Sequence, residues 1–301
     1  MRARYCFKYF WDGFLPEAFV GMFPFLSLND LVASEDDADV VFVGCHGADT
    51  ITPLSAEAYR EGFLVDFKPF HRIPSKIYVY VTWENVIPDP QAVDFSISQL
   101  PDSDTNLFLP MWAAALMYNR FAIPILKSPE REINPDEVPD LSASFLYSHK
   151  VLRRERFARL ISEIMPLAAP GKSICNVDYR VPYGTSHTIE FYSKHAFNIS
   201  FENSMGKGYT TEKLWLPLIA GAVPIYWGDD DAVKYFNSEC FIHLKDFADW
   251  SSCLDHVSDV MSSPARLNAY RSSPCLTQLG ANVIDPDRIE AFFKSIFDHV
   301  S

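Results

Sequence analysis

The sequence predicts an α/β fold of two domains with parallel sheets, and three observations support this prediction. The chain has 301 residues, about twice the length of a typical domain. Short β-branched runs alternate with segments of helical spacing in both halves. The clearest unit lies at 196–227, where strand, loop, helix and strand follow one another in about 32 residues, which is the size of a parallel βαβ crossover.

The elements of the first half are short apolar runs. We expect strands at 3–9, 39–43 and 77–82, with weaker candidates at 95–98 and 106–109. Segment 119–140 is charged and punctuated by prolines, so we expect a loop or an interdomain linker there.

The second half has a clearer pattern. The expected elements are a strand at 144–148, a helix at 152–164, a strand at 174–178, a helix at 185–195, a strand at 196–201, a helix from Thr210 to about 220 and a strand at 222–227. Pro217 lies inside one of these helices and should kink or shorten it. The chain closes on a helix after Asp285, with Pro286 at its first position. Its polar face is not basic, so we expect it to pack on the protein rather than on anionic lipid.

The composition excludes several classes of protein. Lys and Arg number 26 against 39 Asp and Glu, and the resulting net charge of −13 argues against general nucleic-acid binding. No apolar run reaches the length of a membrane span, and charged residues interrupt any secretory signal. The six scattered cysteines are typical of buried thiols in a reducing compartment. We expect a cytoplasmic protein, with peripheral contact at the inner face of the cytoplasmic membrane as the furthest membrane association.

The loop at 202–213 is a candidate anion site. Gly206 and Gly208 allow close backbone approach, and the following helix presents its N-terminus, which favours anions. Lys213 falls in the first helical turn, where the helix dipole disfavours a cation unless an anion lies in front of it. An ordinary surface turn is the alternative.

Three arginines, Arg153, Arg154 and Arg156, begin the helix expected at 152–164. A guanidinium fork suits a phosphate, so one of them could hold the same anion; a solvated basic face is the alternative.

Two acidic positions also stand out. Glu84 follows the strand at 77–82 beside Trp83 and is placed to act as a general base, although a surface acid is the usual alternative. Asp229 and Asp231 form a D-x-D pattern, which many sugar transferases use to hold a divalent metal. We favour an acidic N-cap for a helix at 232–236 over a metal site.

The motifs together resemble those of glycosyltransferase family 10, the α-1,3/4-fucosyltransferases. The long signature is F-E-N-S at 201–204, G-Y-T-T-E-K-L-W at 208–215 and G-A-V-P-I-Y-W-G at 221–228. T-W-E-N at 82–85 is similar to the acceptor-side motif of the family, and F-W-D-G-F at 10–14 is similar to its first loop. Bacterial members look closest.

The resemblance implies a GT-B fold, in which two Rossmann-like domains face a cleft. It implies an acceptor-binding domain at 1–140, a GDP-fucose-binding domain at 141–280 and a C-terminal helix at 281–301 that packs back on the first domain. It further implies an inverting transfer of L-fucose from GDP-β-L-fucose to a GlcNAc hydroxyl. The acceptor would be a Gal-GlcNAc-type oligosaccharide or lipopolysaccharide, and the product an α-1,3-linked, Lewis-type glycan. A transferase for another GDP-sugar and a non-catalytic nucleotide-sugar or glycan binding protein are the alternatives.

The resemblance also assigns roles to residues. Glu84 matches the general base, Arg154 best matches the arginine that binds the diphosphate, and Lys213 matches the lysine that neutralises it. The other matched donor-binding positions are Asn203, Tyr209 and Glu212, with Glu202, Gly208 and Trp83 in supporting roles.

No metal site and no cofactor are expected, with Mg²⁺ or Mn²⁺ at most stimulatory. Trp83 departs from the family, which usually has glycine there, and this change should reshape the acceptor pocket.

Overall fold

The structure, a computed structural model, describes residues 2–46, 51–52, 66–67, 70–131 and 139–300. The chain forms two compact units. The first unit comprises Met1–Arg120, Ser204–Tyr209 and Ala281–Ser301, and the second comprises Phe121–Asn203 and Thr210–Gly280. A loop from the middle of the second unit's sequence, Ser204–Tyr209, thus belongs to the first unit.

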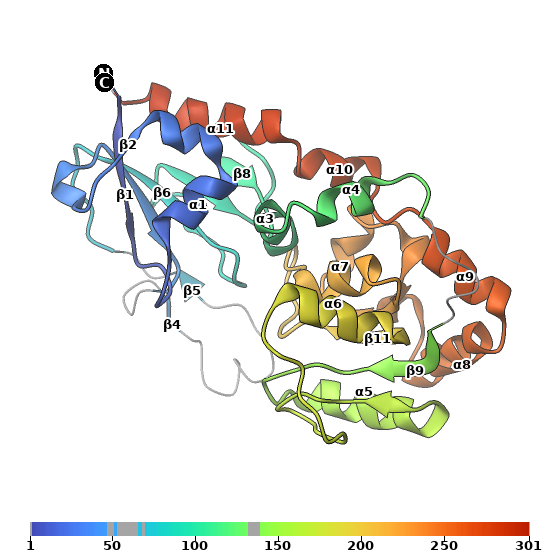
Figure 1. The fold of residues 1–301 in the computed structure, drawn as a ribbon. Helices are drawn as coiled ribbons and strands as arrows, with labels where there is room; N and C mark the ends of the chain where they lie inside the picture. The colour runs from blue at the N-terminus through green and yellow to red at the C-terminus, as the bar shows by residue number, and fades with distance from the viewer. Residues whose placement is uncertain (1, 47–50, 53–65, 68–69, 132–138, 301) are drawn as a thin grey trace. The chain divides into compact units, whose positions relative to one another are not determined.

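The first unit is built on a parallel sheet of six strands in the order β2-β1-β3-β6-β7-β8 (Figure 1). These strands are β1 (Arg4–Lys8), β2 (Asp30–Leu31), β3 (Val40–Gly44), β6 (Ile77–Val81), β7 (Phe95–Ser98) and β8 (Asn106–Phe108). A separate antiparallel pair consists of β4 (Ile51–Thr52) and β5 (Asp66–Phe67). The strands expected in the first half of the sequence are confirmed. The apolar runs of β3 and β6 are almost completely buried, as is typical of the central strands of a parallel sheet.

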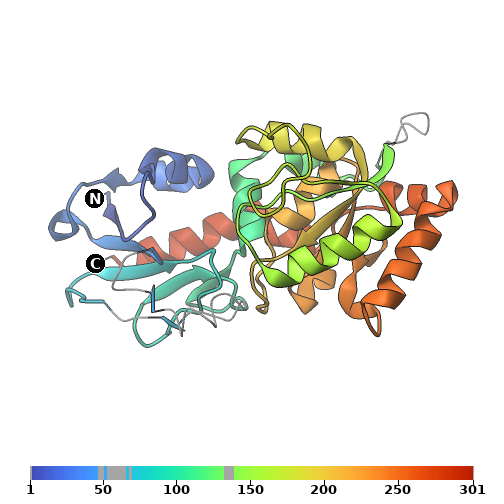
Figure 2. The ribbon, with the colours of Figure 1, turned by 90° about the horizontal axis from the view of Figure 1, so that it is seen from below.

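The C-terminal helix packs on the sheet of the first unit. Helix α11 (Pro286–Asp298) begins after Asp285, whose carboxylate accepts the backbone N–H of Asp287 at 3.0 Å. The ring of Phe293 lies 4.8 Å from that of Phe23 and 6.1 Å from that of Phe42 in β3. Figure 2 shows α11 running along this sheet. The remaining helices of this part are α1 (Pro16–Met22) and α3 (Met111–Tyr118), and α10 (Gln278–Val283) precedes α11.

The second unit is built on a parallel sheet of five strands in the order β10-β9-β11-β12-β13. The strands are β9 (Asp140–Ser144), β10 (Leu167–Ala168), β11 (His195–Phe201), β12 (Val223–Trp227) and β13 (Ile242–His243). The helices are α4 (Ala122–Lys127), α5 (Leu152–Ile164), α6 (Thr185–Ser193), α7 (Glu212–Ile219), α8 (Trp250–Met261) and α9 (Pro264–Ser272). Apolar residues of α5, α8 and α9 share one buried cluster with β11 and β12, so these helices cover the same face. The expected βαβ unit is present. Strands β11 and β12 pair in parallel, and α7 lies between them in the sequence.

Three expectations for this unit are wrong. The strand expected at 144–148 lies instead at 140–144, and the buried Phe145 and Tyr147 follow its end. The described structure has no strand at 174–178, where the side chain of Asn176 instead bonds to the backbone of Leu167 and Ala169 and closes a loop.

The third expectation, a loop or an interdomain linker at 119–140, is wrong only in part, because the boundary between the two units does fall in this segment, after Arg120. It contains the short helix α4, which packs against α7. Pro124 is compatible with this helix because it lies in the first turn, where no intrahelical N–H bond is lost. Residues 132–138 of the segment lie outside the described residues.

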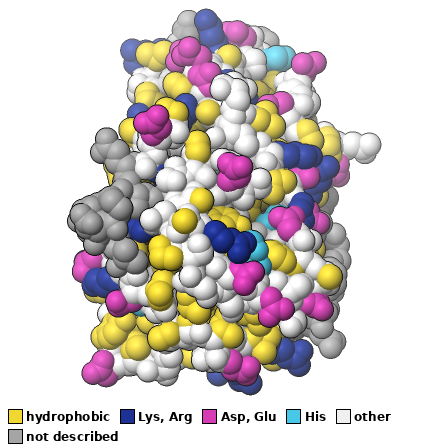
Figure 3. Space-filling view, turned by 90° about the vertical axis from the view of Figure 1, so that its right-hand side faces the viewer, with side chains coloured by type: hydrophobic (Ala, Val, Ile, Leu, Met, Phe, Trp, Pro, Cys, Tyr) yellow, Lys and Arg dark blue, Asp and Glu magenta, His cyan; other side chains and the backbone are white. Residues whose placement is uncertain are grey.

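The surface of the described chain mixes both signs of charge. On the face shown in Figure 3, acidic and basic side chains are interspersed rather than gathered by sign. Within the described ranges, none of the helices has the length and apolar character needed to span a bilayer.

Candidate functional site

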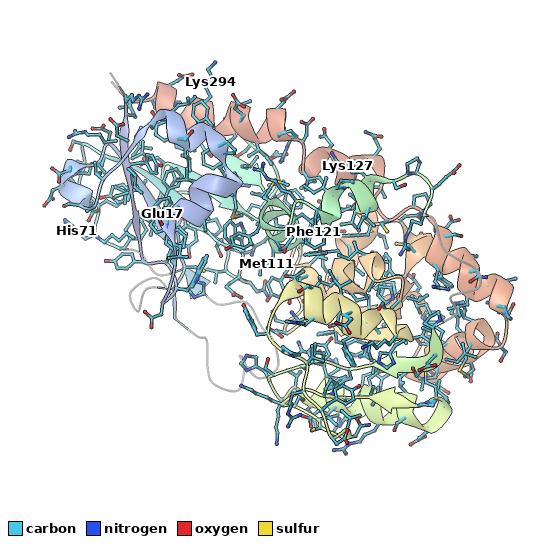
Figure 4. The ribbon with its side chains drawn as sticks, viewed as in Figure 1. Glu17, His71, Met111, Phe121, Lys127 and Lys294 are labelled. Atoms are coloured by element: carbon cyan, nitrogen blue, oxygen red, sulfur yellow. The ribbon has the colours of Figure 1, made fainter. Side chains whose placement is uncertain are left out.

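The carboxyl end of the sheet in the first unit holds Glu84 beside a hollow. Glu84 comes three residues after β6 ends at Val81, and ligands of open parallel sheets bind at this end of the strands. The hollow measures about 250 Å³. It is lined by Phe10, Trp11, Gly44, Cys45, His46, Val81, Trp83, Glu84 and Met111, the last of which is labelled at the start of α3 in Figure 4. One carboxylate therefore faces a mainly apolar and aromatic wall.

Trp83 forms part of that wall. Its ring lies 6.0 Å from Phe19 in a stacked arrangement and 6.4 Å from Trp11 in a tilted one. The indole Nε1 is buried and has no hydrogen-bond partner in the described residues. The residue that departs from the resembled family thus belongs to the aromatic packing around the hollow.

The backbone of Glu84 is held in a tight turn. Its carbonyl accepts the N–H of Val86 at 2.7 Å and the hydroxyl of Thr82 at 3.3 Å. The side chain is exposed, so its carboxylate is accessible to a ligand.

At the carboxyl end of β11 in the second unit lies a buried arginine. Arg154, in the first turn of α5, is only 1% exposed. Its Nε donates to the carbonyl of Phe201 at 3.1 Å and its Nη2 to Oδ1 of Asn203 at 2.5 Å. The exposed Arg153 instead covers the ring of Trp227 at 4.1 Å, and Arg156 is exposed. Of the three arginines considered from the sequence, Arg154 is the one that joins this cluster.

Tyr147 lies beneath the guanidinium of Arg154, whose carbon is 4.0 Å from the ring centroid. The phenol donates to the carbonyl of Ile199 at 2.6 Å and accepts the N–H of Phe201 at 2.7 Å. Burial raises the pKa of Tyr147 to about 12, although the charges of Arg154 and Lys213 oppose this rise. The tyrosine is therefore a neutral and fixed support for the arginine.

Two carboxylates surround Lys213 at the start of α7. Its Nζ lies 3.5 Å from Oε2 of Glu202 and 3.2 Å from Oε1 of Glu212, and it also donates to the hydroxyl of Thr211 at 3.0 Å. The sequence predicted an anion in front of this lysine. The protein itself supplies two acidic partners at this position.

Glu202 is fully buried and organises the loop before α7. It accepts both the N–H and the hydroxyl of Thr211 at 2.7 Å. Burial raises the pKa of Glu202, and Lys213 opposes the shift. For Glu212, burial acts in the same direction, but Lys213 and nearby hydrogen bonds outweigh it and hold the pKa of Glu212 below its ordinary value. A Cβ at Gly228 would lie 2.5 Å from Cγ of Glu202, so a glycine is needed there.

Tyr209 and Gly208 lie in the loop Ser204–Tyr209, which belongs to the first unit. Gly208 has a φ of +77°, and a Cβ there would approach the carbonyl oxygen of Gln99 to 2.8 Å. Tyr209 is buried. The predicted residues therefore divide: the first unit holds Glu84, Trp83, Gly208 and Tyr209, and the second holds Arg154, Glu202, Asn203, Glu212 and Lys213.

The D-x-D pattern forms a cap. Asp229 accepts the N–H of Asp231 at 3.0 Å at the start of the 3-10 helix Asp230–Lys234, and also the hydroxyl of Thr210 at 3.3 Å. Asp231 pairs with Lys234 at 2.9 Å. Over the part of the chain that the structure describes, no group of three or more His, Cys, Asp or Glu side chains is arranged to hold a metal ion.

Most of the predicted site residues lie in a segment that matches a known protein family. Residues 136–272 match the family model for the C-terminal region of glycosyltransferase family 10, the fucosyltransferases. The match covers a little under half of the chain. All the predicted site residues of the second unit, together with Gly208 and Tyr209, lie inside the matched segment.

One of the curated relatives extends the match beyond this segment. The chain is 27% identical to an α-(1,3)-fucosyltransferase of Helicobacter pylori over 73% of its own length and 53% of the relative's length. It is 37% identical to human α-(1,3)-fucosyltransferase 4 over 29% of the chain and 16% of that protein. The chain therefore spans about half the length of these curated relatives or less.

A solved structure matches the whole fold. A crystal structure of an α1,3-fucosyltransferase with GDP-fucose superimposes with a TM-score of 0.75 at 20% identity, covering 100% of this chain and 91% of that one. The likeness confirms the predicted α/β, GT-B-like fold.

Three residues that the structure places at these sites were assigned no role from the sequence. Tyr147 supports Arg154, Thr211 links Glu202 to Lys213, and Asn85 follows Glu84 and bonds to Ser204. Thr211 could have been found as the N-cap of α7, since it precedes the helix and accepts the N–H of Lys213. The partners of Tyr147 and Asn85 lie far away in sequence, and no local pattern indicates them.

Proposed function

We propose that this protein is an inverting α-1,3-fucosyltransferase. It transfers L-fucose from GDP-β-L-fucose to a GlcNAc hydroxyl of a Gal-GlcNAc-type oligosaccharide or lipopolysaccharide. The observation that carries the proposal is the cluster in the segment that matches family 10, where Arg154 is buried against Asn203 and Lys213 stands at the N-terminus of α7. Cations and a helix N-terminus at the end of a parallel sheet suit a departing diphosphate.

The proposed reaction is a single displacement. The acceptor oxygen forms a bond to C1 of fucose while the bond between C1 and the phosphate oxygen breaks. The acceptor proton passes to the carboxylate of Glu84, and GDP leaves with the bonding electron pair. Inversion at C1 converts the β-linked donor into an α-fucoside.

In this proposal each cluster has one task. Arg154 and Lys213 stabilise the charge that develops on the diphosphate, with Asn203, Tyr209 and Glu212 in contact with the nucleotide sugar. The aromatic hollow beside Glu84 takes the acceptor sugar, because apolar walls with one polar group are typical of small-ligand sites.

The proposal also holds that transfer needs no metal. It is supported by the D-x-D carboxylates, since both Asp229 and Asp231 are engaged as a cap and an ion pair. Activity should therefore survive EDTA. If EDTA abolished transfer and Mn²⁺ restored it, Asp229 and Asp231 would be the candidate metal ligands.

The decisive experiment is release of GDP from GDP-fucose in the presence and absence of N-acetyllactosamine, with the product linkage read by NMR. We expect acceptor-dependent release and an α-1,3 linkage to GlcNAc. Turnover of a different GDP-sugar, but not of GDP-fucose, would show that the protein uses that other sugar nucleotide as its donor. Tight binding of GDP without turnover of any donor would make the chain a nucleotide-sugar binding protein.

A further inference from the structure

A buried carboxamide next to Glu84 bonds to a distant loop. Asn85 is 6% exposed, and its Nδ2 donates to the hydroxyl of Ser204 at 2.8 Å and to the carbonyl of Met205 at 3.2 Å. Asn85 and Ser204 are 119 residues apart in sequence, yet both belong to the first unit. The loop Ser204–Tyr209 is flanked by Asn203 and Thr210, which belong to the second unit.

Two glycines allow the loop to lie on the turn that carries Glu84. A Cβ at Gly206 would come within 2.8 Å of both Cγ and Nδ2 of Asn85, so a larger residue there would push this carboxamide aside. Gly208 lies in the same way against Gln99, whose Nε2 donates to the carbonyl of Val86 at 3.0 Å. The loop therefore bonds directly to Asn85 and lies against Gln99, which in turn bonds to Val86.

The bonding of Asn85 is incomplete. Its Oδ1 is buried and accepts no hydrogen bond from the described residues. A buried unpaired acceptor costs roughly 1–3 kcal/mol, which an apolar side chain at this position would avoid. A buried polar atom without a hydrogen-bond partner is rare and calls for an explanation. We expect a carboxamide at this position because its Nδ2 links the loop to the turn, even though its Oδ1 stays unbonded.

We propose that Asn85 is a positioning residue that ties the base-bearing turn at 82–86 to the loop Ser204–Tyr209. This inference rests on the proposed function: a nucleoside diphosphate in contact with Tyr209 orders the loop and, through Asn85, fixes the backbone of Glu84 for proton removal. Misplacement of a catalytic group by about 1 Å can cost roughly 10²-fold in rate.

Steady-state kinetics test the link. Asn85→Ala should lower kcat by about 10- to 10²-fold while KM for the donor changes by less than about threefold, because the cations of the second unit are untouched. Ser204→Ala removes the same bond from the other side. The double variant should be no slower than Asn85→Ala alone.

The matched control is Asn106→Ala. Asn106 is another buried asparagine of the first unit, and its Nδ2 donates to the carbonyls of Leu100 and Pro101 at 2.7 and 3.1 Å. This variant should lower Tm but keep the wild-type kcat per folded molecule. Equal losses of kcat in Asn85→Ala and Asn106→Ala, or additive losses in the double variant, would overturn the proposal.

Hydrogen–deuterium exchange tests the same link without requiring transfer. In the wild-type protein, saturating GDP should slow amide exchange both at 204–213 and at 82–86. In Asn85→Ala, GDP should slow exchange at 204–213 only. If no acceptor is fucosylated but this pattern holds, the proposed function fails and the link stands. If GDP leaves 82–86 unprotected in the wild-type protein, or protects it equally in the variant, the link is refuted.

Discussion

The carboxyl ends of the two sheets carry opposite kinds of site. In the first unit, the exposed carboxylate of Glu84 borders a hollow with aromatic walls. In the second unit, Arg154 and Glu202 are buried and hydrogen-bonded, and Lys213 is paired with carboxylates. Dipoles fixed in advance stabilise developing charge without reorganisation. The site that we propose for the leaving diphosphate is therefore held by buried hydrogen bonds and ion pairs, whereas the site that we propose for the acceptor is lined mainly by apolar surface.

Removing the base should have the largest effect. Glu84→Gln keeps the size of the side chain but cannot take a proton, so kcat should fall by about 10²- to 10⁴-fold. Affinity for GDP, measured by calorimetry, should stay unchanged because the variant leaves the second unit intact. Glu17→Gln, on the exposed face of α1, is the matched control and should behave as the wild type (Figure 4). If Glu84→Gln kept the wild-type kcat, Glu84 would not be the general base.

Altering the buried arginine should have the next largest effect. Arg154→Lys keeps the charge but loses the planar fork that bonds both Phe201 and Asn203, so kcat/KM should fall by about 10²- to 10³-fold. Unlike Glu84→Gln, this variant should also weaken GDP binding. Arg153→Lys, one residue away and exposed, should change kcat/KM by less than about threefold. Equal effects of the two substitutions would mean that the buried network is not the diphosphate site.

Buried titratable groups should also make the second unit sensitive to acid. Burial, aided by Lys245, lowers the pKa of His243 to about 4, and its Nδ1 has no hydrogen-bond partner among the described residues. Between pH 4 and 6.5 the unfolded chain binds the proton more readily, so the free energy of unfolding falls as pH drops through this window. The loss is on the order of 3 kcal/mol.

Urea unfolding at about pH 7 and about pH 4.5 measures this effect. His243→Phe, which should fit among Tyr226 and Phe241, should lose less stability between the two pH values than the wild type does. His187→Phe, at an exposed position of α6, should lose as much stability between the two pH values as the wild type does. If His243→Phe also lost as much stability as the wild type, this histidine would not be a source of the acid sensitivity.

The sequence predicted the elements whose signals are local. The N-cap at Asp285 and the apolar spacing of α11 predicted that helix, and the glycine-bounded strands predicted β11, α7 and β12. Prediction failed where tertiary contacts decide the structure. Phe145 and Tyr147 look like strand residues, but they are buried beyond the end of β9. The position of Ser204–Tyr209 in the first unit depends on Asn85 and Gln99, which no neighbouring residue indicates.

The smallest expected effect concerns the stability of the first unit, where aromatic packing rather than buried charge dominates. Asp285→Ala removes the carboxylate that accepts the N–H of Asp287, and loss of such a cap costs about 1 kcal/mol. Asp285→Asn keeps an acceptor oxygen and should restore most of this stability. Urea unfolding measures the free energy of unfolding of both variants. The rings of Phe293 and Phe297 still hold α11 on the sheet, and the cap lies far in sequence from Glu84. The kcat should therefore stay unchanged. A loss of several kcal/mol, or of kcat, would show that the cap rather than the aromatic contacts holds α11 on the sheet.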